Sequence, residues 1–302
     1  MIPDGVAIGH WSGDGTGITV ITVPPGTVGS GEIRGGAPAE REFALLDPRR
    51  TVRHVDAVVL TGGSAFGLAS ADGVVRDLAA AGRGFPTAGG NVPIVPTLAI
   101  YDLLESRRRP GPDEGAAALA AVGRSVTGGR IGAGTGATVG KWRGREHAVR
   151  GGLGLAHALR EGAQWLAVAV VNALGDVIGD DGAVLAGSTA PADAPAFPTP
   201  APFEESANTT LVVVVTTARL DKATCHRLAG SAHDGFARAL RPAHTSADGD
   251  AAIVLAAGPV EVHPDRAGQL VADLSATAIR AAVGSGVATM DLPTARMVES
   301  GA

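Results

Sequence analysis

Runs of β-branched and apolar residues alternate along the chain with polar, glycine-rich stretches, and this spacing predicts short strands and longer helices. The predicted strands cover residues 17–23, 55–60, about 97–103, 165–171, 174–178, 210–218 and 251–257. Helices are predicted over about 64–81, 114–122, 222–240 and 266–283. Because strands and helices mix without strict alternation, we expect a layered α/β structure with partly antiparallel sheets rather than a doubly wound fold.

Two of the predicted strands, 165–171 and 174–178, flank the polar residue Asn172 and predict a strand pair or one bent strand. A buried side-chain amide costs free energy unless it is hydrogen-bonded. We therefore expect Asn172 either to hold a turn or to present its amide N–H₂ to a ligand.

Residues 187–208 contain five prolines among alanine, serine, threonine and aspartate, a composition typical of an extended, poorly packed connector. The connector ends at Asn208-Thr209-Thr210, and the apolar run 211–215 follows at once. If the chain cut itself after Asn208, Thr209 would gain a free α-amine. That amine titrates near pH ~7.7–8 and could take the proton of the threonine hydroxyl. Taken alone, the pattern is typical of the start of a strand.

The composition excludes several classes of protein. Of the 302 residues, 45% are hydrophobic but only 3% are aromatic, so the interior must be built from alanine, valine, leucine and isoleucine. A net charge of −5, with no basic cluster beyond Arg107-Arg108-Arg109, argues against a nucleic-acid surface. The single cysteine, Cys225, excludes an intrachain disulfide and a multi-cysteine metal site.

The chain shows no sign of a membrane or secreted protein. Its first residues lack the basic region and apolar core of a secretion signal, and no apolar run approaches the ~20 residues that cross a bilayer. We therefore expect a soluble, cytoplasmic protein that has no membrane partner.

Lysine and tyrosine are scarce. Lys141 and Lys222 are the only lysines among 25 basic residues, and Tyr101 is the only tyrosine. Lysine offers a compact ammonium whose pKa can fall on desolvation, which arginine does not. Lys222 follows Asp221 at a predicted helix start and is interpreted as a surface residue. Lys141 ends a glycine-rich turn and is a candidate for chemistry.

That turn, residues 132–141, does not fit a nucleotide site. A phosphate-binding loop would need glycine at Thr135 and serine or threonine at Trp142. A dinucleotide fingerprint on Gly132, Gly134 and Ala137 would need a preceding strand and a following helix, which the sequence does not offer convincingly. We expect no cofactor, and interpret the turn as one that brings backbone close to a substrate and places Lys141 in a pocket.

Two further motifs suggest chemistry that their details do not support. Ser64 lies between a predicted strand and a helix, but Phe66 replaces the final glycine of a nucleophile elbow, so Ser64 is expected to cap the helix. His226 and His233 share one helix face without an accompanying carboxylate motif, so we expect no metal site.

Asp248-Gly249-Asp250 precedes the predicted strand 251–257. Such a sequence is usually a turn. If the strand begins slightly earlier, the period of two puts Asp248 and Asp250 on one face. Two carboxylates there could hold an α-ammonium and orient a hydroxyl.

In combination these residues resemble the DmpA-type aminopeptidase family, which includes the β-aminopeptidases and the nylon-oligomer hydrolases. The resemblance covers most of the chain and is strong only as a set. It rests on residues 60–68, Ile100-Tyr101-Asp102, Gly136 to Lys141, Asn208-Thr209-Thr210 and Asp248-Gly249-Asp250.

The resemblance implies a single four-layer αββα sandwich of the DmpA and ornithine-acetyltransferase type over residues 1–302, cut by the chain itself into 1–208 and 209–302. It implies Thr209 as the nucleophile, with its own amine as the base. It places Asn172 in the oxyanion hole, Tyr101 and Lys141 beside the scissile bond, and Asp248 and Asp250 around Thr209 and its ammonium.

The threonine paired with Asp-Gly-Asp resembles the nylon-oligomer hydrolases more than the serine-based members. The implied substrate is a small peptide or amide, of the aminopeptidase or the 6-aminohexanoate type, and the implied assembly is a homo-oligomer, a tetramer by resemblance. Two alternatives remain open. One is an acyltransferase of the ornithine-acetyltransferase type, which passes its acyl group to an amine. The other is a non-catalytic assembly protein, which would stay a single intact chain.

Overall fold

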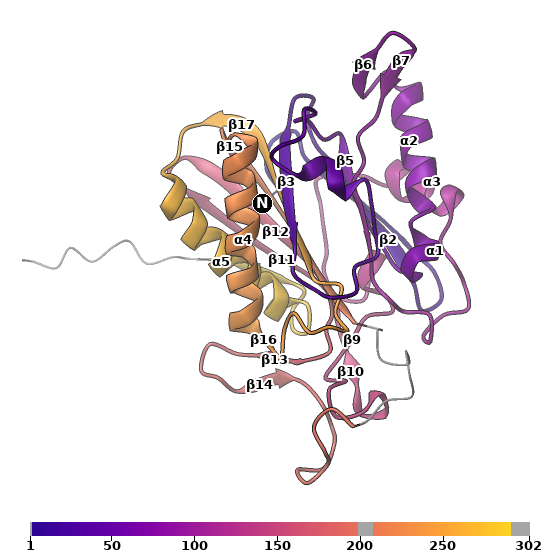
Figure 1. Cartoon of the computed structure of the whole chain (residues 1–302), viewed down its shortest axis with the longest axis vertical. Helices are drawn as coiled ribbons and strands as arrows, with labels where there is room; N and C mark the ends of the chain where they lie inside the picture. The colour runs from indigo at the N-terminus through magenta and orange to yellow at the C-terminus, as the bar shows by residue number, and fades with distance from the viewer. Residues whose placement is uncertain (1, 199–207, 291–302) are drawn as a thin grey trace, which may run out of the picture.

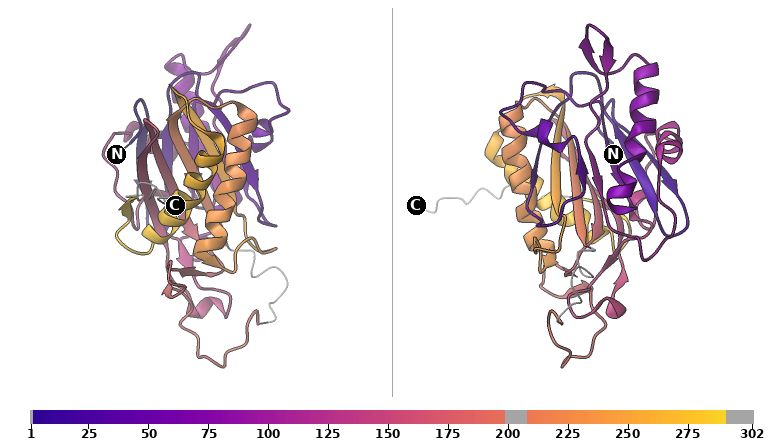
Figure 2. Two further views of the ribbon diagram at one scale, coloured as in Figure 1. Left: turned by 90° about the vertical axis from the view of Figure 1, so that its left-hand side faces the viewer. Right: turned by 45° about the vertical axis from the view of Figure 1, so that its right-hand side comes forward.

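The computed structural model describes residues 2–198 and 208–290 and has four layers, in the order helices, sheet, sheet, helices. Figure 1 shows the two sheets face to face at the centre of the molecule, with one pair of helices outside each. The second view in Figure 2 separates the same layers. This is the αββα sandwich that the sequence predicted, with both partly antiparallel sheets in one unit.

The larger sheet has six strands. In spatial order these are β18 (Val287–Thr289), β11 (Gly152–Arg160), β12 (Ala163–Asn172), β15 (Thr209–Ala218), β17 (Ala251–Val260) and β3 (Val28–Ile33). Helices α4 (Lys222–Ala239) and α5 (Pro264–Ala281) cover its outer face (Figure 1). The predicted strands around 165–171 and 210–218 form the antiparallel pair β12 and β15.

The smaller sheet has five strands, in the order β1 (Ala7–Ser12), β2 (Gly17–Thr22), β5 (Ala57–Thr61), β8 (Thr97–Ala99) and β4 (Glu40–Arg41). Helices α2 (Ser70–Ala80) and α3 (Pro112–Ala120) pack on its outer face, and the one-turn helix α1 (Ser64–Gly67) precedes them. None of the helices in the described ranges combines the length and the apolarity that a membrane span requires.

The remaining described elements are short. They are the 3₁₀ turns η1 (Phe43–Leu46), η2 (Gly132–Gly134) and η3 (Arg145–His147), and the strands β6 (Phe85–Thr87), β7 (Gly90–Val92), β9 (Thr138–Val139), β10 (Val149–Arg150), β13 (Asp176–Ile178), β14 (Val184–Ala186) and β16 (Leu240–Arg241).

The central strands are buried on both faces, which is why the sequence shows unbroken valine runs rather than alternation. On β15, Leu211 and Val213 face the core between the two sheets, whereas Val212 and Val214 face α4 and α5. Strand β15 therefore belongs both to the core between the two sheets and to the core beneath α4 and α5. Packing on both faces holds the residues at its start in place.

Two predicted elements differ from the structure. Strands 165–171 and 174–178 do not pair, because β13 pairs with β14 and β16 instead. The chain leaves the large sheet after Asn172, where the carbonyls of Leu174 and Gly175 accept hydrogen bonds from Lys141 and Gly140. The helix predicted over 64–81 is divided after Gly67 into α1 and α2.

The proline-rich connector is better packed than its composition suggests. Ser188 N donates to Asp176, Thr189 N to His147 O at 3.0 Å, and Phe197 N to Trp142 O at 2.8 Å. The Trp142 and Phe197 rings lie 6.2 Å apart. Residues 187–198 are therefore bound to the segment that follows Lys141, and the rest of the predicted connector, 199–207, lies outside the described residues.

Lys222 is not a surface lysine. Only 5% of it is exposed, and its Nζ donates to the backbone carbonyls of Leu45, Arg50 and Val52 at 2.8, 3.2 and 2.7 Å. Three carbonyl oxygens satisfy the three ammonium donors. Lys222 thus ties the start of α4 to the 45–52 segment, and desolvation lowers its pKa.

Candidate active site

The predicted site residues meet where three strands of the large sheet begin or end. In the β12–β15 ladder, Asn172 is the register partner of Thr209. On the other side of β15, Asn208 forms a parallel bridge with Asp248, just before β17 begins. Residues that are far apart in sequence are therefore adjacent at one edge of the sheet.

The Thr209 hydroxyl lies against the carbonyl that precedes it. The Thr209 hydroxyl donates to the carbonyl oxygen of Asn208. The same oxygen accepts a second hydrogen bond from Gly249 N at 2.9 Å. Thr209 and Asn208 are only 4% and 3% exposed. A hydroxyl and a polarised amide carbonyl are thus held together in a site closed to solvent.

Gly249 is required there by space as well as by its N–H. A Cβ at this position would lie 2.7 Å from the Thr209 hydroxyl oxygen, closer than Cβ contacts normally come. The glycine of Asp248-Gly249-Asp250 therefore lets the loop backbone approach the threonine.

Asn172 and Lys141 form a buried polar pair on the other side of Thr209. Lys141 Nζ donates to both the backbone carbonyl and Oδ1 of Asn172, each at 3.0 Å. Thr138 N also donates to Oδ1 at 3.0 Å, and Asn172 Nδ2 donates to Tyr101 O at 3.0 Å. Because the backbone N–H of Thr138 can only donate, its contact with Oδ1 fixes which way the Asn172 amide points.

The environment of Lys141 disfavours its charge. Burial, together with the guanidinium of Arg145, lowers the pKa of Lys141 well below that of an ordinary lysine, although Asp248 and Glu105 oppose the shift. A buried lysine with a depressed pKa is a candidate for acid–base chemistry. Both lysines are buried, so burial does not distinguish them. They differ in their partners: Lys141 contacts Asn172, whereas Lys222 contacts three backbone carbonyls of the 45–52 segment.

Asp248 and Asp250 hold the backbone around Thr209. Asp250 Oδ1 accepts from Thr210 N at 2.7 Å, and Asp248 Oδ2 accepts from Thr245 N and its hydroxyl at 2.9 and 2.6 Å. In the described ranges neither carboxylate is hydrogen-bonded to Thr209 itself. Burial and the nearby Asp250 charge raise the pKa of Asp248 to about 6.

This pKa gives a pH-dependent prediction for stability. Between pH 4 and 6 the folded Asp248 keeps a proton that the unfolded chain has lost, so the free energy of unfolding falls as pH rises through this window. Asp248→Asn does not titrate. Relative to its parent, it should therefore gain on the order of 1–3 kcal/mol in unfolding free energy between pH 4 and 7.

Denaturant unfolding at both pH values would measure this, with both chains carrying Thr209→Ala so that neither can cut itself. A difference between the two chains that does not change with pH would contradict the buried, raised-pKa carboxyl.

Tyr101 joins the site through its backbone. Its carbonyl accepts a hydrogen bond from Asn172 Nδ2, and within residues 2–198 and 208–290 the phenol ring makes no hydrogen bond to Thr209. Thr138, Gly249 and His244 also contact this site, through main-chain groups or loop geometry that the sequence pattern does not reveal. The available signal for the last two is the Asp248-Gly249-Asp250 turn and the residues just before it.

Two other candidates stand apart from this site. Ser64 does not cap a helix: it is the first residue of α1, has φ 52°, and follows Gly63 at the N-cap, with no side-chain cap bond. His226 Nδ1 and His233 Nε2 donate to the backbone carbonyls of Gly31 and Glu32, respectively. Among the described residues no group of three histidine, cysteine, aspartate or glutamate side chains is placed to hold a metal ion.

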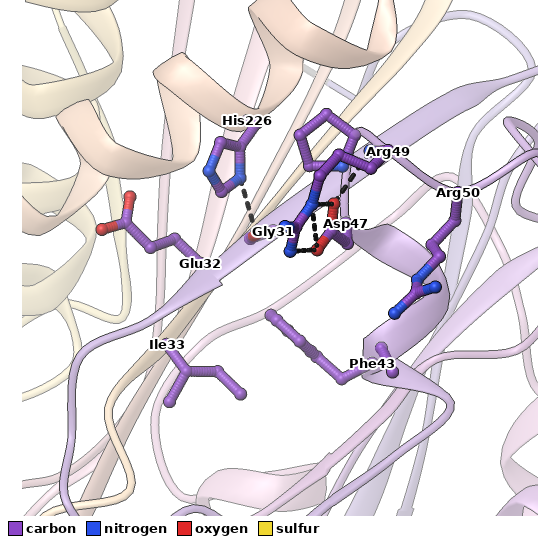
Figure 3. Close-up of a pocket in the computed structure, with 10 residues that line it drawn as sticks. Gly31, Glu32, Ile33, Phe43, Asp47, Arg49, Arg50 and His226 are labelled. Carbon is purple, nitrogen blue, oxygen red and sulfur yellow. Dashed lines mark hydrogen bonds and ion pairs between the residues drawn. The ribbon is translucent and has the colours of Figure 1, made fainter.

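A cavity of about 470 Å³ lies at the edge strand β3, between the segment 43–50 and α4. Figure 3 shows His226 bonded to Gly31 on one wall and the Asp47–Arg49 ion pair on another. None of the residues predicted to be catalytic lines it. The cavity is therefore separate from the Thr209 site.

Comparisons with known proteins identify the family of the chain. A sequence profile of peptidase family S58 matches residues 3–290. An uncharacterized aminopeptidase of Mycobacterium tuberculosis is 41% identical over 311 residues, covering 94% of this chain and 88% of the relative. The 6-aminohexanoate-oligomer endohydrolase of Paenarthrobacter ureafaciens is 31% identical over 264 residues, covering 82% of this chain and 71% of the relative.

Solved structures share the fold at low sequence identity. A Burkholderia sp. β-aminopeptidase superposes with a TM-score of 0.69 at 21% identity, covering 97% of this chain and 87% of that one. The L-aminopeptidase D-Ala-esterase/amidase of Ochrobactrum anthropi, described as a variant of the Ntn-hydrolase fold, gives 0.68 at 17% identity, with 93% and 83% covered. The family match over nearly the whole chain, with these relatives, shows that the chain belongs to peptidase family S58 and is a hydrolase acting on amide bonds.

Proposed function

We propose that the chain is a self-processing amide hydrolase in which Thr209 becomes an N-terminal nucleophile. The observation that carries the proposal is the contact of the Thr209 hydroxyl with the Asn208 carbonyl, which also accepts from Gly249 N. The hydroxyl is next to the carbonyl it would attack, and a backbone N–H already polarises that carbonyl.

In the first stage, the Thr209 hydroxyl oxygen bonds to the carbonyl carbon of Asn208. The Gly249 N–H stabilises the oxyanion that forms on the Asn208 oxygen. Collapse breaks the peptide bond, the Thr209 nitrogen takes the hydroxyl proton, and an ester joins the two residues. Water then hydrolyses the ester, leaving a carboxylate on Asn208 and a free amine and hydroxyl on Thr209.

In the second stage, the Thr209 amine takes the hydroxyl proton and the oxygen attacks the carbonyl carbon of a substrate amide. Lys141 and Asn172, which are hydrogen-bonded to each other, are the polar side chains beside the reacting carbonyl carbon. The leaving amine takes the proton, and water resolves the acyl-enzyme to release the acid. The β-branched threonine limits χ1, which keeps the hydroxyl in place at small entropic cost.

The substrate class follows from what the relatives are called. One is named an aminopeptidase and another a 6-aminohexanoate-oligomer endohydrolase. Both names describe hydrolysis of amide bonds, which supports a small peptide or amide as substrate. The Asp248-Gly249-Asp250 loop next to a threonine favours the oligomer-hydrolase type.

We expect the cleaved protein to release p-nitroaniline from at least one of a set of α- and β-aminoacyl p-nitroanilides, or to hydrolyse the linear dimer of 6-aminohexanoate. Parallel assays with a primary amine acceptor give the contrast. Turnover that depends on the acceptor and yields an N-acylated amine would instead support an acyltransferase. An intact chain without turnover on any of these substrates would support a non-catalytic protein.

A further inference from the structure

His244 connects the buried face of α4 to the start of the nucleophile strand. Its backbone N and its ring Nδ1 both reach Asp250 Oδ2, at 3.0 and 2.9 Å. Since a carboxylate oxygen only accepts, Nδ1 is the donor. Asp250 is 1% exposed, so this carboxylate is held entirely by protein groups.

The other oxygen of Asp250 replaces a missing backbone partner in the sheet. The parallel ladder between β15 and β17 begins at Leu211 and Ala251 and therefore does not include Thr210. The N–H of Thr210 donates instead to Asp250 Oδ1 at 2.7 Å. A side chain thus takes the place of the missing strand partner, one residue from Thr209.

The His244 ring is itself fixed by aromatic packing. Its centroid lies 4.7 Å from that of His233 and 5.3 Å from that of Phe236, both on α4. Its Nε2 is buried with no hydrogen-bond partner among the described residues. The ring therefore has one polar contact, the one to Asp250.

The backbone at His244 is also unusual. Its φ of 56° lies in the left-handed region, which costs a non-glycine residue on the order of 1 kcal/mol or more. Histidine and asparagine tolerate this region better than most residues do. In this conformation both the backbone N–H and Nδ1 lie within hydrogen-bond distance of the same carboxylate oxygen.

We propose that His244 is a positioning residue for the Thr209 reaction, acting through Asp250 to hold the Thr210 backbone and so the direction of the threonine hydroxyl. This inference rests on the proposed function of Thr209. In this role His244 affects the rates of both self-cleavage and turnover.

Two variants separate the hydrogen bond from the packing. His244→Asn and His244→Gly both remove the imidazole ring, and both asparagine and glycine tolerate the left-handed backbone. Only asparagine keeps an N–H₂ near the position of Nδ1. Loss of ring packing should therefore cost both variants similar stability, whereas loss of the Asp250 contact should affect glycine alone.

We expect His244→Gly to lower the self-cleavage rate and kcat by about 10–10²-fold with KM nearly unchanged, because a small displacement of a reacting group costs about this much. His244→Asn should stay within about fivefold of the parent rate. Equal rates for the two variants, or equal losses in both, would overturn the positioning role.

A second readout does not need activity. In the uncut Thr209→Ala chain, hydrogen exchange at the Thr210 amide should be faster with His244→Gly than with His244→Asn. Equal exchange in the two would overturn the inference even if Thr209 is the nucleophile. If the parent chain never cuts itself, the proposed function fails, and the exchange difference still decides whether His244 holds Asp250.

Discussion

Replacing Thr209 by alanine is expected to leave one full-length chain that has no measurable amide hydrolysis. Both proposed stages use the same oxygen, and removing a nucleophile that acts as a unit with its base leaves almost nothing of the rate. The alanine fits the strand, because within the described ranges the side chain of Thr209 makes one hydrogen bond, to the neighbouring carbonyl. A denaturing gel and the p-nitroanilide assay would measure the two losses together.

Thr209→Ser is the matched control. It keeps the attacking oxygen and loses only the methyl group that restricts χ1, so the chain should still cut itself, more slowly, and retain part of the activity. An alanine variant that is still cut at the same bond would assign cleavage to another residue or to a separate protease.

Lys141→Arg is expected to reduce amide hydrolysis by about 10²–10³-fold, the effect of losing one preorganised donor. Lys141 Nζ reaches two oxygens of Asn172 from inside a site in which it is 6% exposed. A planar guanidinium is larger, stays charged, and cannot make the same pair of contacts from that position. Overpacking of the site should also lower stability by about 1–3 kcal/mol.

Lys222→Arg provides the control for that cost in stability. Lys222 is equally buried, but its three carbonyl partners lie in the 45–52 segment, away from Thr209. The two variants should lose comparable thermal stability, whereas only Lys141→Arg should lose turnover per folded molecule. Parallel losses of activity in both would remove Lys141 from the site.

The sequence predicted the long strands that are apolar throughout and missed several that are short or contain glycine, among them β1, β3 and β11. Strands around 210–218 and 251–257 and the helices on either side of them follow from hydrophobic pattern alone. Strands β3 and β11 escaped prediction because glycine has low strand propensity. Their glycines serve packing between layers: a Cβ at Gly154 of β11 would lie 2.0 Å from Ala278 O of α5.

The site was predictable as a set of residue types but not as a geometry. Thr209, Asn172, Lys141 and the two aspartates were all nominated from the sequence, and the structure joins them through strand register and hydrogen bonds. The Gly249 N–H and the His244 contact could not be predicted, because both depend on how the 244–250 loop folds back on β15. The burial of Lys222 could not be predicted either, because its partners lie in the 45–52 segment, far away in the sequence.

The most direct test of the central claim is N-terminal sequencing of the purified protein after separation on a denaturing gel. We expect two fragments that co-purify under native conditions, because β12 of the large fragment pairs with β15 of the small fragment in one sheet. The large fragment should keep the original N-terminus, and the small one should begin Thr-Thr-Leu-Val, from Thr209. A single chain of full length, or a small fragment that starts at any other residue, would contradict it.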